Sequence, residues 1–223
     1  KLKSYSVVGV LPEILDLKYL FLEVQSKIYY NSNRTSSSQF VSNKVLDNIE
    51  KYANSTELNK YGARFKYSKF LKIIDDTHES ITSNITTISM RRDLRVVLNS
   101  FAEYSIGFGN AFQVNKLDGY NIKSSAFRIA NLDADVYLGD FPNVNRSTGT
   151  LFLFTVPNVN STSPTILKRN VGFIDYVNGI ITLNPIVVTS AKSVNGQATI
   201  EISANPRSND VVGLQDLYLQ LDT

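Results

Sequence analysis

Cysteine and tryptophan are absent from this chain of 223 residues, and histidine and methionine occur once each. The lack of cysteine excludes disulfides, thiolate metal sites and a cysteine nucleophile. A chain that needs no oxidation to be stable suits synthesis in a reducing cytoplasm. The single histidine, His78, leaves one candidate for any imidazole-dependent chemistry.

Long apolar runs are also missing, because no stretch approaches the roughly 18 residues of a membrane-spanning helix. No signal peptide is visible, and the first residue, Lys1, is not methionine, which indicates an excerpt or a processed form. The net charge of +3 is too mild to indicate a nucleic-acid partner by itself. With 43% hydrophobic and 19% charged residues, the composition is that of a globular protein.

Side chains that could catalyse a reaction are scarce in this sequence. His78 lies in IIDDTHES beside Asp75, Asp76 and Glu79, a set that is simpler to explain as solvated groups at a helix end than as a metal or acid–base site. No nucleophile elbow accompanies it. GFGNAF, from Gly107 to Phe112, falls short of a phosphate-binding G-x-G-x-x-G and no helical pattern follows it. We therefore predict no catalytic residue, no metal site and no cofactor.

The first part of the chain mixes strand and helix signals. The stretch from Leu17 to Tyr30 is rich in aromatic and β-branched residues, which favours a strand. Ser36 and Gln39 fit a capping box before a helix whose apolar stripe carries Val41, Val45, Ile49 and Tyr52. A second helix is expected from Tyr67, Phe70, Leu71 and Ile74, and β character returns from Ile81 to Leu98.

From about Asn99 the helical period disappears, and short β stretches alternate with Gly, Pro, Asn and Asp. The sequence therefore predicts an α+β fold: a small strand–helix–helix–strand region followed by an antiparallel β domain, either a sandwich or a partly open barrel. We expect an α+β docking region at residues 1–99 and the antiparallel β domain at residues 100–223.

The stretch GFIDYVNGIITLNP, from Gly172 to Pro185, carries the strongest local signal. Asn178-Gly179 between two β runs predicts a two-residue type I′ hairpin in which Val177 opposes Ile180 and Asp175 opposes Thr182. One face then holds Ile174, Tyr176, Ile181 and Leu183, which we expect in the core. Phe173, Val177 and Ile180 face outward with polar neighbours, as at protein interfaces.

LYLQLD near the C-terminus has a similar two-faced pattern, with Leu217, Leu219 and Leu221 on one side and Tyr218 on the other. Candidate interface residues are therefore Phe173, Val177, Ile180 and Tyr218. A surface covered within the same domain is the alternative explanation for the mixed faces.

A second candidate surface is basic. KYGARFKYSKFLK, from Lys60 to Lys72, interleaves Arg64, Lys66, Lys69 and Lys72 with aromatic residues, as nucleic-acid-binding segments do. Helical spacing favours another explanation, in which Tyr67, Phe70, Leu71 and Ile74 are buried and the lysines cover the solvated face. Arg91, Arg92 and Arg95 form a further basic group whose partners the sequence does not indicate. A Tyr-rich β domain that binds glycans is a related alternative, weakened by the absence of tryptophan.

Four segments together carry a family resemblance: YLFLEVQSKIYYN, ARFKYSKFLKIIDDTHESITSNITTISMRRDL, VGFIDYVNGIITLNP and IEISANPRSNDVVGLQDLYLQLD. The chain resembles the distal part of the large inner-ring wedge subunit of T-even-type contractile-tailed phage baseplates. It is more distantly similar to the J-type baseplate proteins of other contractile tails.

The resemblance implies a late, structural virion protein without catalytic residues, assembled in the host cytoplasm and located in the tail baseplate. It implies homodimers that link neighbouring wedges into a ring around the hub, contact other wedge and hub proteins, and move during sheath contraction. From the composition and the helical spacing we expect no membrane association, and we favour protein partners over nucleic acid. The alternative remains a surface β domain that binds glycan or nucleic acid.

Overall fold

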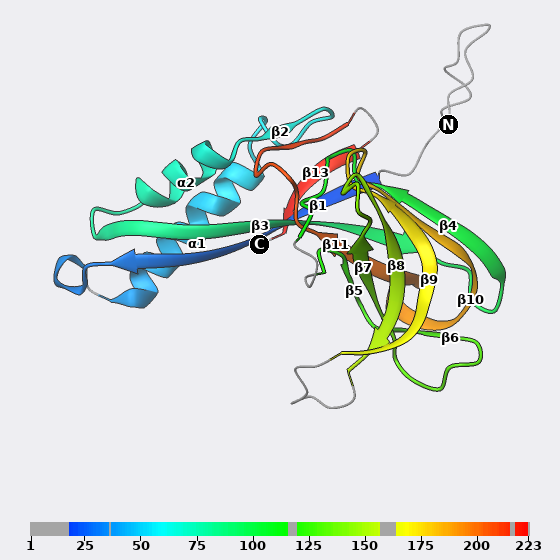
Figure 1. Ribbon diagram of the computed structural model, residues 1–223. Helices are drawn as coiled ribbons and strands as arrows, with labels where there is room; N and C mark the ends of the chain where they lie inside the picture. The colour runs from blue at the N-terminus through cyan, green and yellow to red at the C-terminus, as the bar shows by residue number, and fades with distance from the viewer. Residues whose placement is uncertain (1–17, 36, 116–119, 157–163, 215–216, 223) are drawn as a thin grey trace, which may run out of the picture.

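The computed structural model describes residues 18–35, 37–115, 120–156, 164–214 and 217–222, shown in Figure 1. Its first part contains β1 (Lys18–Tyr30), a 3-10 turn (Ser32–Arg34), α1 (Ser38–Ala53), β2 (Arg64–Phe65), α2 (Tyr67–Asp75) and β3 (Ile81–Arg95). The rest is β structure: β4 (Phe101–Gly107), β5 (Lys123–Ser124), β6 (Phe127–Ile129), β7 (Tyr137–Pro142), β8 (Thr148–Thr155), β9 (Thr165–Asp175), β10 (Ile180–Val194), β11 (Gln197–Ala204), β12 (Val211–Val212) and β13 (Leu217–Asp222). The predicted α+β class and the order strand, helix, helix, strand are confirmed.

The two helices form where the apolar spacing predicts them. Ser37 is the N-cap of α1, since its hydroxyl accepts a hydrogen bond from the backbone N–H of Phe40. The predicted capping box of Ser36 and Gln39 is therefore wrong, because Phe40, and not Glu or Gln, occupies the third helical position after Ser37. Ser36 itself lies outside the described residues. Neither helix in the described part of the chain is long and apolar enough to cross a membrane.

An aromatic cluster fixes α2 against α1. Tyr52 of α1 packs against Phe65 and Phe70, with ring centroids 6.3 and 6.2 Å away, and Phe65 and Phe70 are 5.4 Å apart. Phe70 and Ile74 are fully buried, so the stripe of α2 belongs to the core. The exposed lysines of α2 therefore occupy its solvated face, as the helical spacing favours.

One large sheet connects the two predicted regions. Its strand order is β13-β1-β3-β11-β10-β9-β8-β7, with β4, β5 and β6 paired beside that path. All pairs are antiparallel except β1 with β13, which run parallel and align Leu20 with Leu219. Because β11 pairs with β3 and β13 with β1, strands from both sides of residue 99 lie in the same sheet. The two-domain division stays a prediction.

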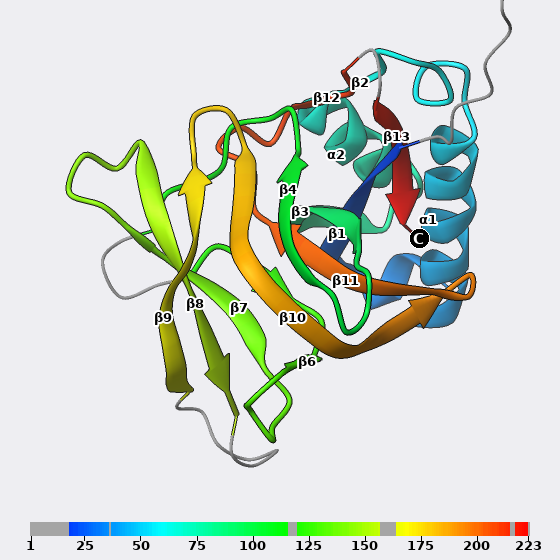
Figure 2. The same cartoon turned by 90° about the vertical axis from the view of Figure 1, so that its right-hand side faces the viewer.

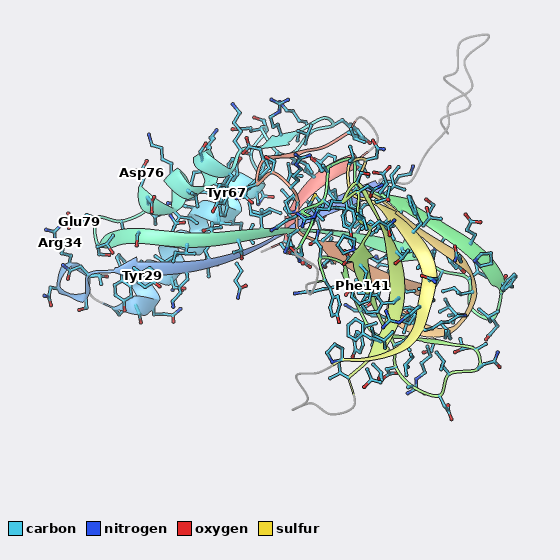
Figure 3. The ribbon with its side chains drawn as sticks, in the orientation of Figure 1. Tyr29, Arg34, Tyr67, Asp76, Glu79 and Phe141 are labelled. Carbon is cyan, nitrogen blue, oxygen red and sulfur yellow. The ribbon has the colours of Figure 1, made fainter. Side chains whose placement is uncertain are left out.

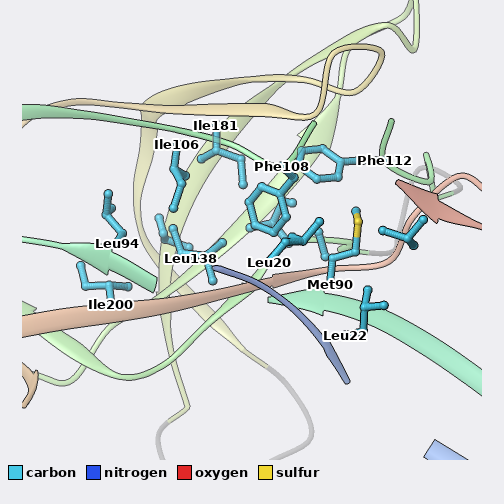
Figure 4. Packing of buried hydrophobic residues seen from close by; sticks show 14 of the residues in the cluster. Leu20, Leu22, Met90, Leu94, Ile106, Phe108, Phe112, Leu138, Ile181 and Ile200 are labelled. Atoms are coloured by element: carbon cyan, nitrogen blue, oxygen red, sulfur yellow. The ribbon is translucent and has the colours of Figure 1, made fainter. Parts of the chain in front are cut away.

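The sheet curves strongly through β10 but does not close into a barrel (Figure 2). β10 pairs with β9 and β4 near its start and with β6 and β11 near its end, so it bends around the core. Figure 4 shows this core, in which Leu20 and Met90 meet Phe108, Phe112 and Leu138. Burying these large side chains together contributes about 1.5–3 kcal/mol for each.

The hairpin between β9 and β10 exists, but its predicted turn was wrong. Asp175 pairs with Ile180 and Ile174 with Ile181, so a four-residue loop, Tyr176 to Gly179, replaces the two-residue turn. Gly179 alone of the loop residues has positive φ, whereas a type I′ turn needs it at Asn178 too. The register differs from the prediction by two residues, an even number, so each side chain keeps its predicted face.

Contacts within and below the loop explain this register. The Asp175 carboxylate accepts hydrogen bonds from the backbone N–H groups of Val177 and Asn178, both at 2.9 Å, and from the Asn178 amide at 2.7 Å. These hydrogen bonds, with the Asn178 backbone first, lower the pKa of the Asp175 carboxyl. The N–H groups of Phe108 and Phe112 donate to the carbonyls of Gly179 and Tyr176, at 2.8 and 2.7 Å. The loop is therefore held from both sides.

We expect Gly179→Ala to destabilise the protein by more than about 2 kcal/mol, because the new Cβ would lie 2.0 Å from the Asn110 carbonyl oxygen and φ is +64°. Gly196→Ala is the matched control: its φ is +79°, but no atom lies within 4 Å of the added Cβ. It should cost only the backbone strain of about 1 kcal/mol. Urea unfolding measures both, and equal losses would contradict the close-approach explanation.

Candidate docking surfaces

Phe173, Val177 and Ile180 lie on the outer side of the curved sheet, exposed by 45%, 54% and 38%. Their neighbours along the strands, Ile174 and Ile181, point to the opposite side and are buried in the core. The outward orientation predicted for the three residues is thus observed, while their role in an interface stays a prediction.

Pairing of neighbouring strands extends this side into a continuous surface, which we call the outer face. Phe173 lies opposite Thr150 of β8 and Thr182 of β10, and Thr150 lies opposite Phe141 of β7. These residues form one cross-strand row from β7 to β10. Phe141 is labelled in Figure 3, at the edge strand of this part of the sheet.

Aromatic rings support the β7 end of the outer face. Phe152 packs against Phe141 and Tyr120, with centroids 4.4 and 4.9 Å away. Gly139 makes room for it, since a Cβ there would lie 2.5 Å from the Phe152 ring. The Arg169 guanidinium lies 5.6 Å from the centroid of Phe141. Clustered rings beside an arginine are the residue types enriched at the energetic centres of protein interfaces.

A buried polar connection lies behind the outer face. Asp140 of β7 accepts hydrogen bonds at one carboxyl oxygen from the backbone N–H groups of Asn121 and Ile122, at 2.8 and 2.6 Å. Its other oxygen accepts from the hydroxyl of Tyr176, at 2.5 Å. Asp140 therefore ties the hairpin loop to β7 and to the segment before β5. Burial raises the pKa of the Asp140 carboxyl, against the opposite effect of the Tyr176 hydrogen bond.

Tyr218 lies elsewhere. It sits on β13, with its ring 5.9 Å from Tyr19 and 5.8 Å from Tyr61. β1, β3, β11 and β10 separate β13 from β9 in the sheet order, so the structure does not bring Tyr218 together with Phe173, Val177 and Ile180. It belongs to a second surface formed by the uncovered side of β13, β1 and β3, where Ile85 is also 59% exposed.

The second surface has a charged network that the sequence did not reveal. One Arg91 amino nitrogen lies 3.1 Å from a Glu23 carboxyl oxygen and 2.8 Å from one of Asp222. The guanidinium also lies 4.5 Å from the Phe21 centroid. Glu23 further accepts from the hydroxyls of Ser89 and Ser203. Arg91 thus connects β1, β3 and β13. Its acidic partners could not be predicted from the sequence.

The predicted basic patch is exposed but partly neutralised. Arg64, Lys66, Lys69 and Lys72 are all exposed, on β2, at the N-cap of α2 and along α2. Lys69 forms an ion pair with Glu57. At the N-terminal end of α2, the backbone N–H of Tyr67 donates a hydrogen bond to the carboxylate of Asp210, at 2.8 Å. Acidic groups therefore lie within the patch, and nucleic-acid binding there stays the untested alternative.

His78 has a structural role in the turn between α2 and β3. Its Nδ1 lies 2.8 Å from the Ser80 hydroxyl oxygen and accepts from the Ser80 backbone N–H at 3.2 Å. Its ring packs edge-on against Phe40, with centroids 5.7 Å apart. In the part of the chain that the structure describes, no three His, Cys, Asp or Glu side chains gather in a way that could hold a metal ion.

The segment GFGNAF, from Gly107 to Phe112, also contributes to the core and not to a ligand site. Phe108 and Phe112 are buried in the core, and Gly109 has φ +65° close to Leu214. The Asn110 side chain exchanges two hydrogen bonds with the backbone of Val212, at 2.8 and 3.0 Å, and so joins this segment to β12. Sequence reasoning missed this link and Asp140; a single acid or amide among apolar neighbours was the available signal for both.

Comparisons with known proteins show that part of this chain is similar to phage baseplate proteins. Residues 18–93 match the family model described as baseplate structural protein gp6, C-terminal domain III. The chain is also 28% identical over 95 residues to baseplate wedge protein gp6 of Enterobacteria phage T4, covering 42% of this chain and 14% of that protein. The chain thus matches a small fraction of that relative's length. The resemblance to a T4-type baseplate wedge protein is confirmed over this part.

We expect Asp140→Ala to lower the free energy of unfolding by about 2–4 kcal/mol, because three buried donors lose their acceptor. Tyr176→Phe removes one of the three hydrogen bonds and should cost about 1–2 kcal/mol. Urea unfolding monitored by circular dichroism measures both variants. A loss below that of Tyr176→Phe in the alanine variant would show that the three donors do not depend on Asp140.

The same site should respond to pH. The folded-state pKa of Asp140 is raised, so its contribution to stability is complete below the unfolded-state pKa of about 3.9 and falls as pH rises through the folded pKa. We expect the stability of the wild type relative to Asp140→Asn, which does not titrate, to decrease from about pH 4 to pH 7. A difference that is constant or rises over this range would contradict the raised pKa.

Proposed function

We propose that this chain is a non-enzymatic structural component of a phage tail baseplate, located in the virion. The observation that carries the proposal is the match of residues 18–93 to a C-terminal domain of a baseplate structural protein. The 28% identity to a baseplate wedge protein over 95 residues also supports it. On this proposal the fold presents surfaces to other baseplate proteins and performs no reaction.

The outer face is the proposed self-association surface. Phe173, Val177 and Ile180 are exposed apolar side chains on a sheet whose register is fixed by the hairpin loop and by Asp140. Because their backbone is already ordered, binding would cost little additional conformational entropy. A specific interface typically buries about 1,200–2,000 Å2 in total, which requires the neighbouring β7 and β8 side chains to take part.

The second surface and the helical side are the proposed contacts with other wedge and hub proteins. In the assembled baseplate, dimers of this chain link neighbouring wedges into a ring around the hub. Residues 1–99 act as a docking region and residues 100–223 as the β domain. β11 and β13 are hydrogen-bonded to β3 and β1, which favours movement of the whole described part as one body when the sheath contracts.

We expect Phe173→Glu with Ile180→Glu to weaken self-association at least about tenfold, because each charge replaces a partly exposed apolar contact and would be buried unpaired. Sedimentation equilibrium of the chain at micromolar to high micromolar concentration measures this. The variant should keep the wild-type unfolding midpoint, since both positions already contact solvent.

Ile85→Glu is the matched control, because Ile85 is an exposed apolar residue on the second surface, away from β9 and β10. It should leave self-association unchanged. A wild-type chain that stays monomeric throughout the range would remove the self-association part of the proposal. Failure of the chain to co-sediment with any wedge or hub protein from the same phage would overturn the structural role.

A further inference from the structure

The dipeptide Asn-Gly occurs twice in this chain, each time after a valine. Val177-Asn178-Gly179 lies in the loop between β9 and β10, and Val194-Asn195-Gly196 lies at the turn between β10 and β11. Asparagine deamidates most readily before glycine, because glycine has no Cβ to hinder attack of its backbone nitrogen on the asparagine side chain. Since the two sequences are so similar, a difference in reactivity between the two sites reports on the fold.

The turn between β10 and β11 lies at the margin of the molecule and is open to solvent (Figure 2). Val194 pairs with Gln197 across it. Asn195 and Gly196 have φ of 51° and 79°, and a two-residue type I′ turn needs positive φ at both positions. A Cβ built at Gly196 would meet no atom within 4 Å beyond its chain neighbours. In the part of the chain that the structure describes, the Asn195 side chain has no hydrogen-bond partner.

The loop at Asn178 is instead held by contacts on two sides. The Asn178 side-chain amide donates to the Asp175 carboxylate at 2.7 Å, and the Asn178 backbone N–H donates to the same group at 2.9 Å. Gly179 is buried, and a Cβ built there would overlap the Asn110 carbonyl. The amide that would react is therefore fixed on Asp175, in a loop that packs closely against Asn110.

Deamidation requires only water as a co-reactant. The backbone nitrogen of Gly196 attacks the side-chain carbonyl carbon of Asn195 and loses its proton, the new C–N bond closes a succinimide ring, and ammonia leaves. Water then opens the ring at either carbonyl and yields aspartate or isoaspartate. The turn must leave its type I′ conformation for this attack, and exposed hairpin tips open locally at small cost in free energy. At Asn178 the same opening also breaks the hydrogen bonds to Asp175.

We propose that Asn195 is a site of spontaneous deamidation in the folded protein and that the fold protects Asn178. Each event replaces a neutral amide by a carboxylate, which lowers the net charge of +3 by one. The isoaspartate product also lengthens the main chain, which a two-residue turn cannot accommodate in its register. The short pairing of Lys192–Val194 with Gln197–Thr199 therefore loosens, while β11 stays hydrogen-bonded to β3. This chemistry does not depend on the proposed baseplate role.

Incubation of the folded chain in mildly alkaline buffer at body temperature tests the proposal, because proteolysis and mass spectrometry then measure both sites in one sample. The change in peptide mass identifies deamidation, and enzymatic methylation of isoaspartyl residues distinguishes isoaspartate from aspartate. Asn195 should react at least about tenfold faster than Asn178, because only Asn178 has to break fixed contacts first. Hydrogen exchange in the deamidated fraction should quicken at Val194 and Gln197, but not at the pairs between β3 and β11.

Two controls separate the fold from the sequence. In urea both sites lose their surroundings, so their rates should agree within about threefold. Asp175→Ala removes the carboxylate that holds Asn178, and it should raise the deamidation rate of Asn178 at least about fivefold without changing that of Asn195. Circular dichroism verifies that this variant is folded.

Equal rates at the two sites of the folded chain, or a faster reaction at Asn178, would overturn the proposal. The same holds if Asn195 stays intact in the folded chain while it reacts in urea, because the turn would then be too rigid to cyclise. An unchanged rate at Asn178 in folded Asp175→Ala would contradict the protection assigned to Asp175.

Discussion

Strand β3 is the element on which the rest of the structure depends, because it is hydrogen-bonded on both sides. Met90 lies opposite Leu22 of β1 and also opposite Ala204 of β11, and Arg91 lies opposite Phe21 and Ser203. The helix-covered half and the curved half of the sheet therefore share one register. A shift of β3 by a single residue would move Met90 out of the core and bury Arg91, so the hydrophobic pattern fixes this register strongly.

The buried Asp140 and the half-buried Asn110 extend this order to segments outside the main sheet. Asp140 holds the hairpin loop through Tyr176, and Asn110 holds β12 through the backbone of Val212. A buried acceptor or amide that lost its partners would cost more free energy than the bond contributes, so these links favour one arrangement. Asp140 and Asn110 thus connect loops to strands that are distant along the chain.

The surfaces follow from this arrangement in different ways. The outer face exists because alternation along β9 and β10 leaves Phe173 and Ile180 outside while Ile174 and Ile181 are buried. The second surface has its charged network because Glu23, Arg91 and Asp222 meet on the uncovered side of β1, β3 and β13. The outer face presents apolar side chains, and the second surface presents the charged network around Arg91. A component that contacts several neighbours in an assembly gains specificity from surfaces of such different chemistry.

Local patterns in the sequence were sufficient for the α+β class, for both helices, and for the burial of Ile174, Tyr176, Ile181 and Leu183. Those features depend on residue spacing alone, since a helix repeats every 3.6 residues and a strand every two. The sequence was insufficient for the hairpin register, because the loop is held by Phe108 and Phe112, which are distant along the chain. It also could not reveal the partners of Arg91 or the parallel pairing of β13 with β1. These depend on which distant strands become neighbours, and only the packing of the complete sheet decides that.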